Sequence, residues 1–324
     1  MTIIDDFAPE LTGFLSELSV EPNDNSVTFG RRTVRGETTQ EIRNELASAF
    51  YAELHAGVPV DRPKPLSPSR DTDFEALLVA GVPHATSPVE AEVVPDPSSG
   101  PDADTVLVEI GRTRVRVPAG TVVESRRDGD RVVLAMPAVR PALSPGFMLI
   151  SGSAPASAGP GGDVLRLYAH VAGSAPAPSI WASVVRTLEE RNAEYRAKVL
   201  SAPESFPRRD AIVVYLPEAS WKHADAVADA MGDVPGLDAA TSPLTMRLAP
   251  GIGMAWEPSD QRTGWKRMSF GQHRTAALAD GVLRHLAGAP ILEAIAAAFE
   301  EASIDPLEPA RNLGSPDFSL TVRR

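Results

Sequence analysis

The chain has 324 residues and a hydrophobic content of 43%, which is enough for two ordinary domains or one large one with a sizeable core. Its 31 basic and 43 acidic residues give a formal charge of −12, which argues against a surface built to bind nucleic acid or an anionic membrane. The chain contains no cysteine, so disulfides, thiolate nucleophiles and cysteine-ligated metal centres are excluded.

The first ten residues carry three acidic side chains and lack the basic segment and apolar run of a secretory signal. No stretch reaches the roughly 18 apolar residues that a membrane-spanning helix needs. We therefore expect a cytoplasmic protein with neither a membrane nor a nucleic acid as a partner.

Composition shifts mark three candidate breaks, at 58–72, 86–104 and 151–163. The third, Ser-Gly-Ser-Ala-Pro-Ala-Ser-Ala-Gly-Pro-Gly-Gly-Asp, has almost nothing to bury and is the best domain boundary. The sequence therefore predicts an accessory domain at 1–150, a linker at 151–163 and a second domain at 164–324.

Periodicity changes along the first half. Apolar residues recur every four positions over 39–54, which predicts an amphipathic helix. Alternating residues then predict antiparallel strand pairs at 106–117 and at 121–136, the second pair around the turn signal Asp128-Gly129-Asp130. The apolar positions of the helix are Ile42, Leu46, Phe50 and Leu54.

Strands and helices alternate in the second half. Strands are predicted at 164–171, 197–200, 211–216, 244–249 and 252–256, and helices at 179–195, 218–231, 271–286 and 291–302. The predicted fold class is α+β: a C-terminal α/β domain with a mixed sheet and flanking helices, preceded by a smaller domain of helix plus antiparallel sheet.

Signatures of several enzyme classes are missing. The chain has no Gly-x-Ser-x-Gly, no phosphate-binding loop ending in lysine and no His-Glu-x-x-His. Gly251-Ile252-Gly253 is too short for a nucleotide loop and indicates a turn at the start of a strand. The six histidines show no close ligand pair, so we expect neither a metal nor another cofactor.

Charged and polar side chains interrupt the apolar runs of the second half. Arg166, Tyr168 and His170 alternate along one predicted strand and share one of its faces. That face is either a polar groove or a solvated surface. Further polar residues in the same half are Lys198, Arg208, Arg209, Tyr215, Arg247, His273 and Arg274.

Four blocks of this half resemble the HopA-type effector family. They are Arg-x-Tyr-x-His, Lys-Val-Leu-Ser-Ala-Pro, Ser-Pro-Leu-Thr-Met-Arg-Leu-Ala-Pro and Ser-Phe-Gly-Gln-His-Arg, within 165–286, and the helix at 39–54 is weakly similar. Members of the family belong to plant-pathogen type III secretion. Others stand in actinobacterial gene clusters for class V lanthipeptides and thioamide-containing ribosomal peptides, beside an aminoglycoside-phosphotransferase-like kinase.

The residue order is also similar to that of phosphothreonine lyases and the lyase domains of class III and IV lanthipeptide synthetases, which use a histidine, then a lysine, then arginines. This resemblance implies a lyase-like C-terminal domain that eliminates phosphate from a phosphorylated precursor peptide, giving dehydroalanine or dehydrobutyrine. The kinase and the precursor peptide would then be the partners, and the accessory domain would recognise the peptide or dock the kinase.

Roles follow from the chemistry of elimination. Lys198 is expected to remove the Cα proton, since arginines around a lysine disfavour its charged form. His170 is expected to protonate the departing oxygen, with His273 as the alternative, and Tyr215 is the next candidate for the base. The phosphate-binding residues would be Arg166, Arg208, Arg209, Arg247 and Arg274.

Two other functions stay open: a non-catalytic binding module or activator for a partner kinase, and a phosphotransferase, which lacks its nucleotide loop. Each site residue also has an ordinary structural explanation, such as a surface ion pair between Arg208 and Asp210 or a histidine bonded to a carbonyl. The lyase interpretation predicts that His170, Lys198, Arg274 and Arg208 or Arg209 line one cleft.

Overall fold

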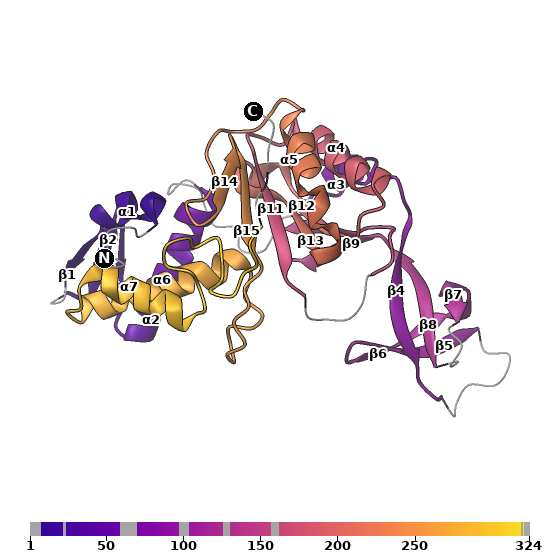
Figure 1. The fold of residues 1–324 in the computed structure, drawn as a ribbon, viewed down its shortest axis with the longest axis horizontal. Coiled ribbons are helices and arrows are strands. Elements are labelled where there is room, and N and C mark those ends of the chain that lie inside the picture. The colour runs from indigo at the N-terminus through magenta and orange to yellow at the C-terminus, as the bar shows by residue number, and fades with distance from the viewer. Residues whose placement is uncertain are drawn as a thin grey trace.

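The computed structural model describes residues 8–21, 24–58, 70–96, 104–125, 130–156, 162–318 and 320. These residues form three antiparallel sheets and seven α-helices, so the predicted α+β class is confirmed. In Figure 1 a seven-stranded sheet occupies the middle of the molecule and a five-stranded sheet protrudes at one end. The other end holds α1 (Pro9–Ser16), β1 (Ser19–Glu21), β2 (Ser26–Phe29), β3 (Arg32–Arg35), α2 (Thr39–Phe50), α6 (Phe270–Leu286) and α7 (Ile291–Glu301).

Every pair of neighbours in the central sheet is antiparallel, so the predicted mixed sheet is wrong. A helix does connect β11 to β12, but β13 lies between these two strands and runs antiparallel to both. Alternating apolar residues predict where a strand lies but not which strands pair with it. The strand order is β14 (Met246–Ala249), β15 (Ile252–Trp256), β11 (Val164–Val171), β13 (Arg208–Pro217), β12 (Arg196–Leu200), β10 (Phe147–Ser151) and β9 (Val139–Ser144).

The segment 151–163 connects two strands of this one sheet. On its N-terminal side β10 pairs with β12 from Phe147 to Ser151, and β9 completes the edge. The sheet is therefore built from both sides of the boundary drawn in the sequence. Gly251, with φ of 73°, lies in the turn between β14 and β15, which confirms that prediction.

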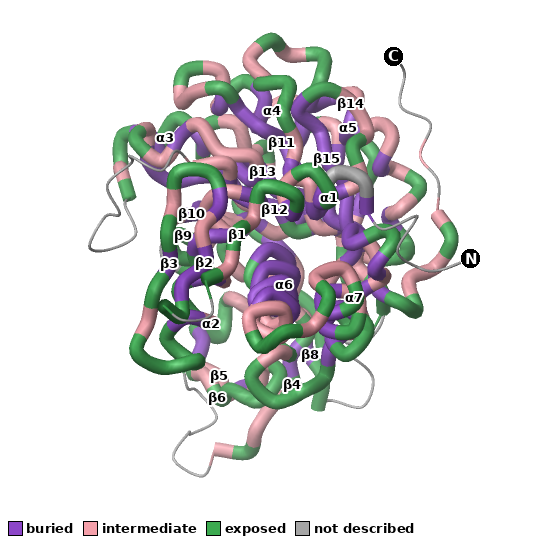
Figure 2. The backbone as a smooth tube through the Cα atoms, turned by 90° about the vertical axis from the view of Figure 1, so that its left-hand side faces the viewer, coloured by how far each residue is buried: buried purple, intermediate pink, exposed green. Residues whose placement is uncertain are grey.

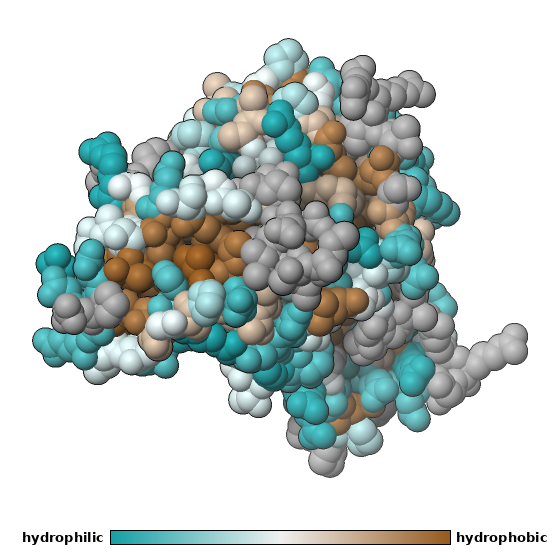
Figure 3. Space-filling model, turned by 60° about the vertical axis from the view of Figure 1, so that its left-hand side comes forward, coloured by the Kyte–Doolittle hydropathy of each residue, from teal (hydrophilic) through white to brown (hydrophobic). Residues whose placement is uncertain are grey.

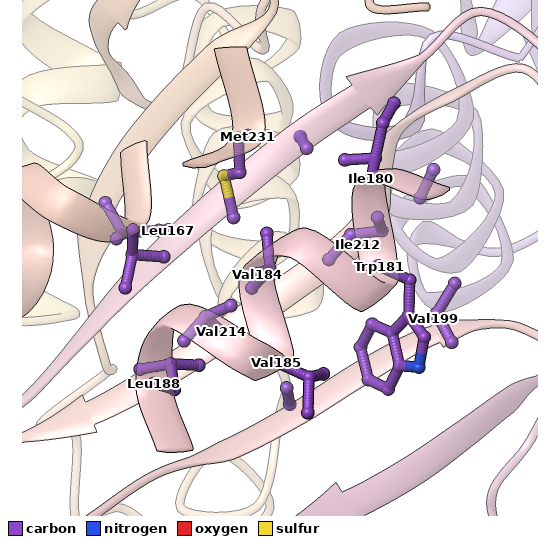
Figure 4. Packing of buried hydrophobic residues seen from close by; sticks show 14 of the residues in the cluster. Leu167, Ile180, Trp181, Val184, Val185, Leu188, Val199, Ile212, Val214 and Met231 are labelled. Atoms are coloured by element: carbon purple, nitrogen blue, oxygen red, sulfur yellow. The ribbon is translucent and has the colours of Figure 1, made fainter. Parts of the chain in front are cut away.

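One face of the sheet packs on α3 (Thr72–Val79), α4 (Ala177–Glu190) and α5 (Ala224–Gly232). The apolar stripe of α4 lies against alternate residues of β11, β12 and β13, as Figure 4 shows. Trp181 is fully buried there and donates to Leu78 O at 3.1 Å. The labelled residues of this core are Leu167, Ile180, Trp181, Val184, Val185, Leu188, Val199, Ile212, Val214 and Met231.

The opposite face packs on α2 and α6. The helix predicted at 39–54 is confirmed, with Ile42, Leu46 and Phe50 buried, but its last part widens into a π-helix, Tyr51–Ala56. A capping box at Thr38 begins α2, and another at Ser269 begins α6. Figure 2 shows α6 as a buried helix between α2 and α7. The second hydrophobic core therefore unites the first and last parts of the chain.

The five-stranded sheet confirms both predicted strand pairs. The first part of the break predicted at 86–104 is instead a strand that pairs along β8, with Ser87 and Ala91 buried. Asp128-Gly129, 59–69 and 97–103 lie outside the described residues. The strand order is β6 (Thr113–Pro118), β5 (Thr105–Ile110), β4 (Thr86–Val93), β8 (Arg131–Pro137) and β7 (Val122–Ser125).

The surface mixes polar and apolar regions. Figure 3 shows hydrophobic side chains reaching the surface at the end of the molecule that holds the N-terminal elements and the last helices. Phe14, Leu18, Ile291 and Leu292 are partly buried side chains that pack on the second core. None of the helices in the described part of the chain is long and apolar enough to span a bilayer.

Candidate active site

Two rows of residues cross the central sheet on the side of α6. Residues directly opposite in an antiparallel pair point to the same face, so each row shares the face that Tyr168 and Val213 contribute to the second core. The first row is Tyr168, Val213, Lys198, Leu149 and Arg140, and the second is Arg166, Tyr215, Arg196 and Ser151. The structure thus brings Lys198, Tyr215 and Arg166 together on one face.

Lys198 is half-buried, with its Nζ 4.0 Å from the centre of the Phe147 ring. The Arg208 guanidinium lies over the same ring at 5.4 Å. Within the described ranges Lys198 forms no ion pair. The Lys198 amine and the Arg208 guanidinium therefore contact the same aromatic ring.

Tyr215 is flanked by two guanidinium groups, that of Arg166 at 4.8 Å and that of Arg196 at 5.6 Å from its ring centre. Arg166 is buried and bonds Glu257 through two nitrogens, each at 2.5 Å. Burial disfavours the charged guanidinium, but Tyr168 and Glu257 outweigh it and raise the pKa of Arg166. Glu257 neutralises Arg166, whereas Arg196 has no carboxylate within 4.0 Å in the described part of the chain.

A polar cluster joins the π-helix to β13. Arg208 donates to both carboxylate oxygens of Asp210 at 2.7 Å and to the Tyr51 hydroxyl at 3.2 Å. Tyr51 in turn donates to Asp210 at 3.2 Å. Burial favours the neutral acid, but Arg208 outweighs it and lowers the pKa of Asp210. The ion pair predicted for Arg208 and Asp210 therefore exists, but it is largely buried and bound to a third residue.

His55 completes this cluster, and the sequence analysis missed it. Its Nε2 lies 3.9 Å from Asp210 Oδ2, beyond hydrogen-bond distance, and its buried Nδ1 has no partner among the described residues. Burial lowers its pKa to about 4, so the ring is neutral at pH 7. A lone histidine between apolar residues carries no sequence signal. Single-turn π-helices occur often at functional sites, but this one was predicted as ordinary helix.

Arg209 and Arg247 belong to a different part of the molecule. Arg209 donates to the carbonyls of Glu53 and Leu54, both at 3.0 Å. With Arg247 it lines a separate cavity of about 540 Å³. The β11–β13 register shifts between Ala169, which lies opposite Ile212, and Val171, which lies opposite Arg208 instead of Asp210, and this shift changes the direction of neighbouring residues at this end of the strand. Lys198 does not line this cavity, so the structure does not bring Arg209 and Arg247 together with it.

His170 also lies away from the row of Lys198. Its Nδ1 is 2.8 Å from Ala240 O, which matches the carbonyl-bonded explanation. Tyr168, and not His170, is in register with Val213 and hence with Lys198. The structure does not place His170 beside the predicted base.

Arg274 is fully buried and its donors are used within the protein. It donates to Pro309 O, to Arg311 O, to Asn312 Oδ1 and to His273 Nδ1, at 2.8 to 3.0 Å. Burial lowers its pKa to about 9. The prediction that Arg274 binds phosphate in a cleft is therefore wrong, because its guanidinium anchors the C-terminal segment instead.

His273, the alternative acid, is equally enclosed. It accepts from Arg274 and its Nε2 lies 3.2 Å from Asp260 Oδ2. Burial and the Arg274 charge lower its pKa to about 4. This buried network stabilises the start of α6 and is closed to substrate.

A cleft of about 930 Å³ opens beside the second row, between the central sheet and β4. Tyr215, Arg196 and Arg140 line it on one side, and Pro88, Val89 and Glu90 on the other. Among the described residues no group of three or more histidine, aspartate or glutamate side chains could hold a metal ion.

No curated protein matches this chain. The effector protein from Pseudomonas syringae pv. tomato strain DC3000 is similar in structure, with 15% identity, a TM-score of 0.47, and coverage of 86% of this chain and 91% of that one. The effector protein from Pseudomonas syringae pv. syringae strain 61 has 14% identity, a TM-score of 0.45, and coverage of 86% and 99%. Residues 138–311, more than half of the chain, match the HopA1 effector protein family. The chain therefore belongs to the HopA1 effector protein family.

Proposed function

We propose that this protein is a phosphoserine/phosphothreonine lyase that eliminates phosphate from a phosphorylated ribosomal precursor peptide. The observation that supports the proposal is the position of Lys198. It lies without a carboxylate partner, among the described residues, on a sheet face that also carries Arg196 and Tyr215, and it contacts the same Phe147 ring as Arg208. A basic amine and a group of guanidiniums are what this reaction needs.

The reaction balances with these residues alone. The neutral Lys198 amine takes the Cα proton, and the electrons of that bond form the Cα=Cβ double bond. The Cβ–O bond breaks, and phosphate leaves with its electron pair. Arg196 and Arg208 would hold the phosphate oxygens and stabilise the charge that develops on them. The Tyr215 hydroxyl would supply a proton to the departing oxygen.

These roles differ from those assigned from the sequence, and Arg209 and Arg247, which line a separate cavity, are not among the phosphate-binding residues. His170 and Arg274 are occupied by internal hydrogen bonds, so neither takes part in the revised mechanism. Arg166 is a positioning residue, since Glu257 holds its guanidinium against the Tyr215 ring. The phosphorylated peptide would come from a kinase of the aminoglycoside-phosphotransferase type.

The test is mass spectrometry of a synthetic phosphoserine peptide incubated with purified protein. The proposal predicts loss of phosphoric acid, and no loss with the Lys198→Met variant. Lys222→Met, which removes a lysine from the turn before α5, is the matched control and should react like the parent. If conversion occurs only after a catalytically inactive kinase is added, the lyase site is in this chain and needs the bound kinase for activity.

A second candidate, a non-catalytic binding module or kinase activator, is favoured by a different observation. Arg166 and Arg208 are already neutralised by Glu257 and Asp210, which leaves fewer cations for a leaving phosphate. This candidate predicts binding of the phosphopeptide with no change in its mass.

A further inference from the structure

The cleft between the two larger sheets has cationic residues on the wall formed by the central sheet. Arg140 and Arg196 line that wall, on adjacent rows of the sheet. Burial lowers the pKa of Arg140, and the neighbouring Arg196 guanidinium lowers it further. Within the described residues neither arginine has a carboxylate within 4.0 Å. Two cations held close together without a counter-ion make this wall a site for an anion.

The opposite wall is a strand with an open edge. Over Thr86–Ala91, β4 pairs with β8 on one side only, because β5 pairs with it just at Glu92 and Val93. Among the described residues no strand pairs with its other side in that range. Pro88, Val89 and Glu90 of this stretch line the cleft. Unpaired strand edges accept extended peptides through backbone hydrogen bonds.

The cleft also lies beside the candidate active site. Tyr215 lines it, and Arg140 is in the same cross-strand row as Lys198. Glu90, Glu194 and Glu218 line it as well, but none of them is within 4.0 Å of Arg140 or Arg196 in the described part of the chain. The cationic wall therefore keeps its charge available to a ligand.

We propose that this cleft binds an extended acidic segment of a peptide, with its carboxylates toward Arg140 and Arg196 and its backbone along the open edge of β4. The inference rests on the proposed function in one respect: the segment would flank the phosphorylated residue that reacts at Lys198. It assigns the five-stranded sheet a role in holding the substrate.

Binding is measured by fluorescence anisotropy with a labelled, unphosphorylated peptide of alternating glutamate and serine, and with its glutamine counterpart. R140E and R196E should each weaken binding of the glutamate peptide by about 10-fold or more, and R140Q by less. R112E is the matched control: it makes the same charge change in the exposed β5–β6 turn and should bind like the parent. Equal affinities for R112E, R140E and R196E, or equal affinities for the two peptides, would overturn the inference.

Position in the cleft is tested through a single thiol, since the chain has no cysteine. A bromoacetyl group on the peptide should alkylate V89C faster when the peptide carries glutamate than when it carries glutamine. V123C, on the exposed strand β7, should react equally with both. Equal rates at V89C would place the peptide elsewhere.

These measurements are independent of catalysis. K198M should bind the unphosphorylated peptide like the parent protein. If binding behaves as expected and no phosphate is ever eliminated, the proposed function fails and the acidic-peptide cleft stands. If phosphate is eliminated while R140E and R196E bind the glutamate peptide like the parent protein, the proposed peptide-binding cleft is wrong and the proposed lyase function stands.

Discussion

Lys198 and Arg208 lie over the same aromatic ring, that of Phe147, with the Lys198 Nζ at 4.0 Å and the Arg208 Cζ at 5.4 Å from its centre. They come from adjacent antiparallel strands, β12 and β13. This contact places a base candidate and a phosphate-binding candidate side by side. Burial affects the pKa of both His55 and Asp210 most, and the positive charges of Arg208 and Lys198 lower both pKa values.

The role of Lys198 is tested by separating binding from turnover. Lys198→Met should reduce elimination from a phosphopeptide by roughly 10²–10⁴-fold or more, as expected for loss of a general base. Phosphopeptide affinity should change little, because the amine acts in the transition state. Single-turnover kinetics and anisotropy measure the two quantities. Unchanged turnover would remove Lys198 from the mechanism and make Tyr215 the next candidate.

Arg274 is predicted to act on stability. Arg274→Met would leave Pro309 O, Arg311 O and Asn312 Oδ1 without their buried donor. We expect a loss of about 3 kcal/mol or more in the free energy of unfolding, measured in urea. Arg247→Ala, at an exposed position, should change it by less than about 0.5 kcal/mol. A stable Arg274→Met protein that no longer binds phosphopeptide would restore Arg274 to the binding site.

Two buried histidines predict a dependence of stability on pH. The folded-state pKa values of His55 and His273 are both about 4, against 6.5 for an ordinary histidine. Between these values the unfolded chain binds protons that the folded chain does not, so stability is full above pH 6.5 and is lost as the pH falls toward 4. From pH 7 to 5 we expect a loss of about 2 kcal/mol for each histidine.

Urea unfolding at pH 7 and pH 5 measures this loss. Most aspartate and glutamate residues are largely ionised in both states over that range and contribute less than the histidines. Burial raises the pKa of Glu53, and the contribution of this residue is common to the parent and the His55→Phe variant. His55→Phe keeps an aromatic ring and removes the titrating group, and should show about half the loss. An identical loss in the parent and in His55→Phe would mean that His55 is protonated in the folded protein.

Gly271 sets how closely the π-helix approaches α6. A Cβ at this position would clash with the His55 ring and with Tyr51. Gly271→Ala should therefore lower the melting temperature and reduce elimination, since Tyr51 holds Asp210 and Arg208. Gly13→Ala, in α1 with open space around its Cβ, should be neutral or stabilising. Equal stability of the two variants would show that the π-helix packs more loosely than described.

The sequence predicted the strands and helices of the second half because their apolar periods are clear. All of them are present, although 218–231 is a 3-10 turn, Glu218–His223, followed by α5. The pairing of the strands could not be predicted, since apolar residues alternate in the same way in parallel and antiparallel pairs. The strand at Thr86–Val93 was not predicted, because Pro88 and the polar residues at its exposed positions are typical of a loop.

The candidate site was only partly predictable. Lys198, Tyr215 and Arg166 share a face because they occupy matched positions on three paired strands. Arg274 was misjudged since a polar run at a helix start predicts exposure, whereas the backbone acceptors at 309–312 that bury it are distant in sequence. The position of His55 in the site depends on a π-helix, and the positions of Arg140 and Arg196 in the cleft depend on the order of the strands. Sequence periodicity predicts neither of these features.

The most direct measurement of the central claim is the chemical identity of the product from a synthetic phosphoserine peptide. Elimination removes phosphoric acid and leaves dehydroalanine, so the product should then add a small thiol, and Lys198→Met should give neither change. Loss of HPO₃ alone, returning a serine peptide that ignores the thiol, would indicate a phosphatase and contradict the account. Tight binding with no change in mass would contradict it equally and would support the binding module.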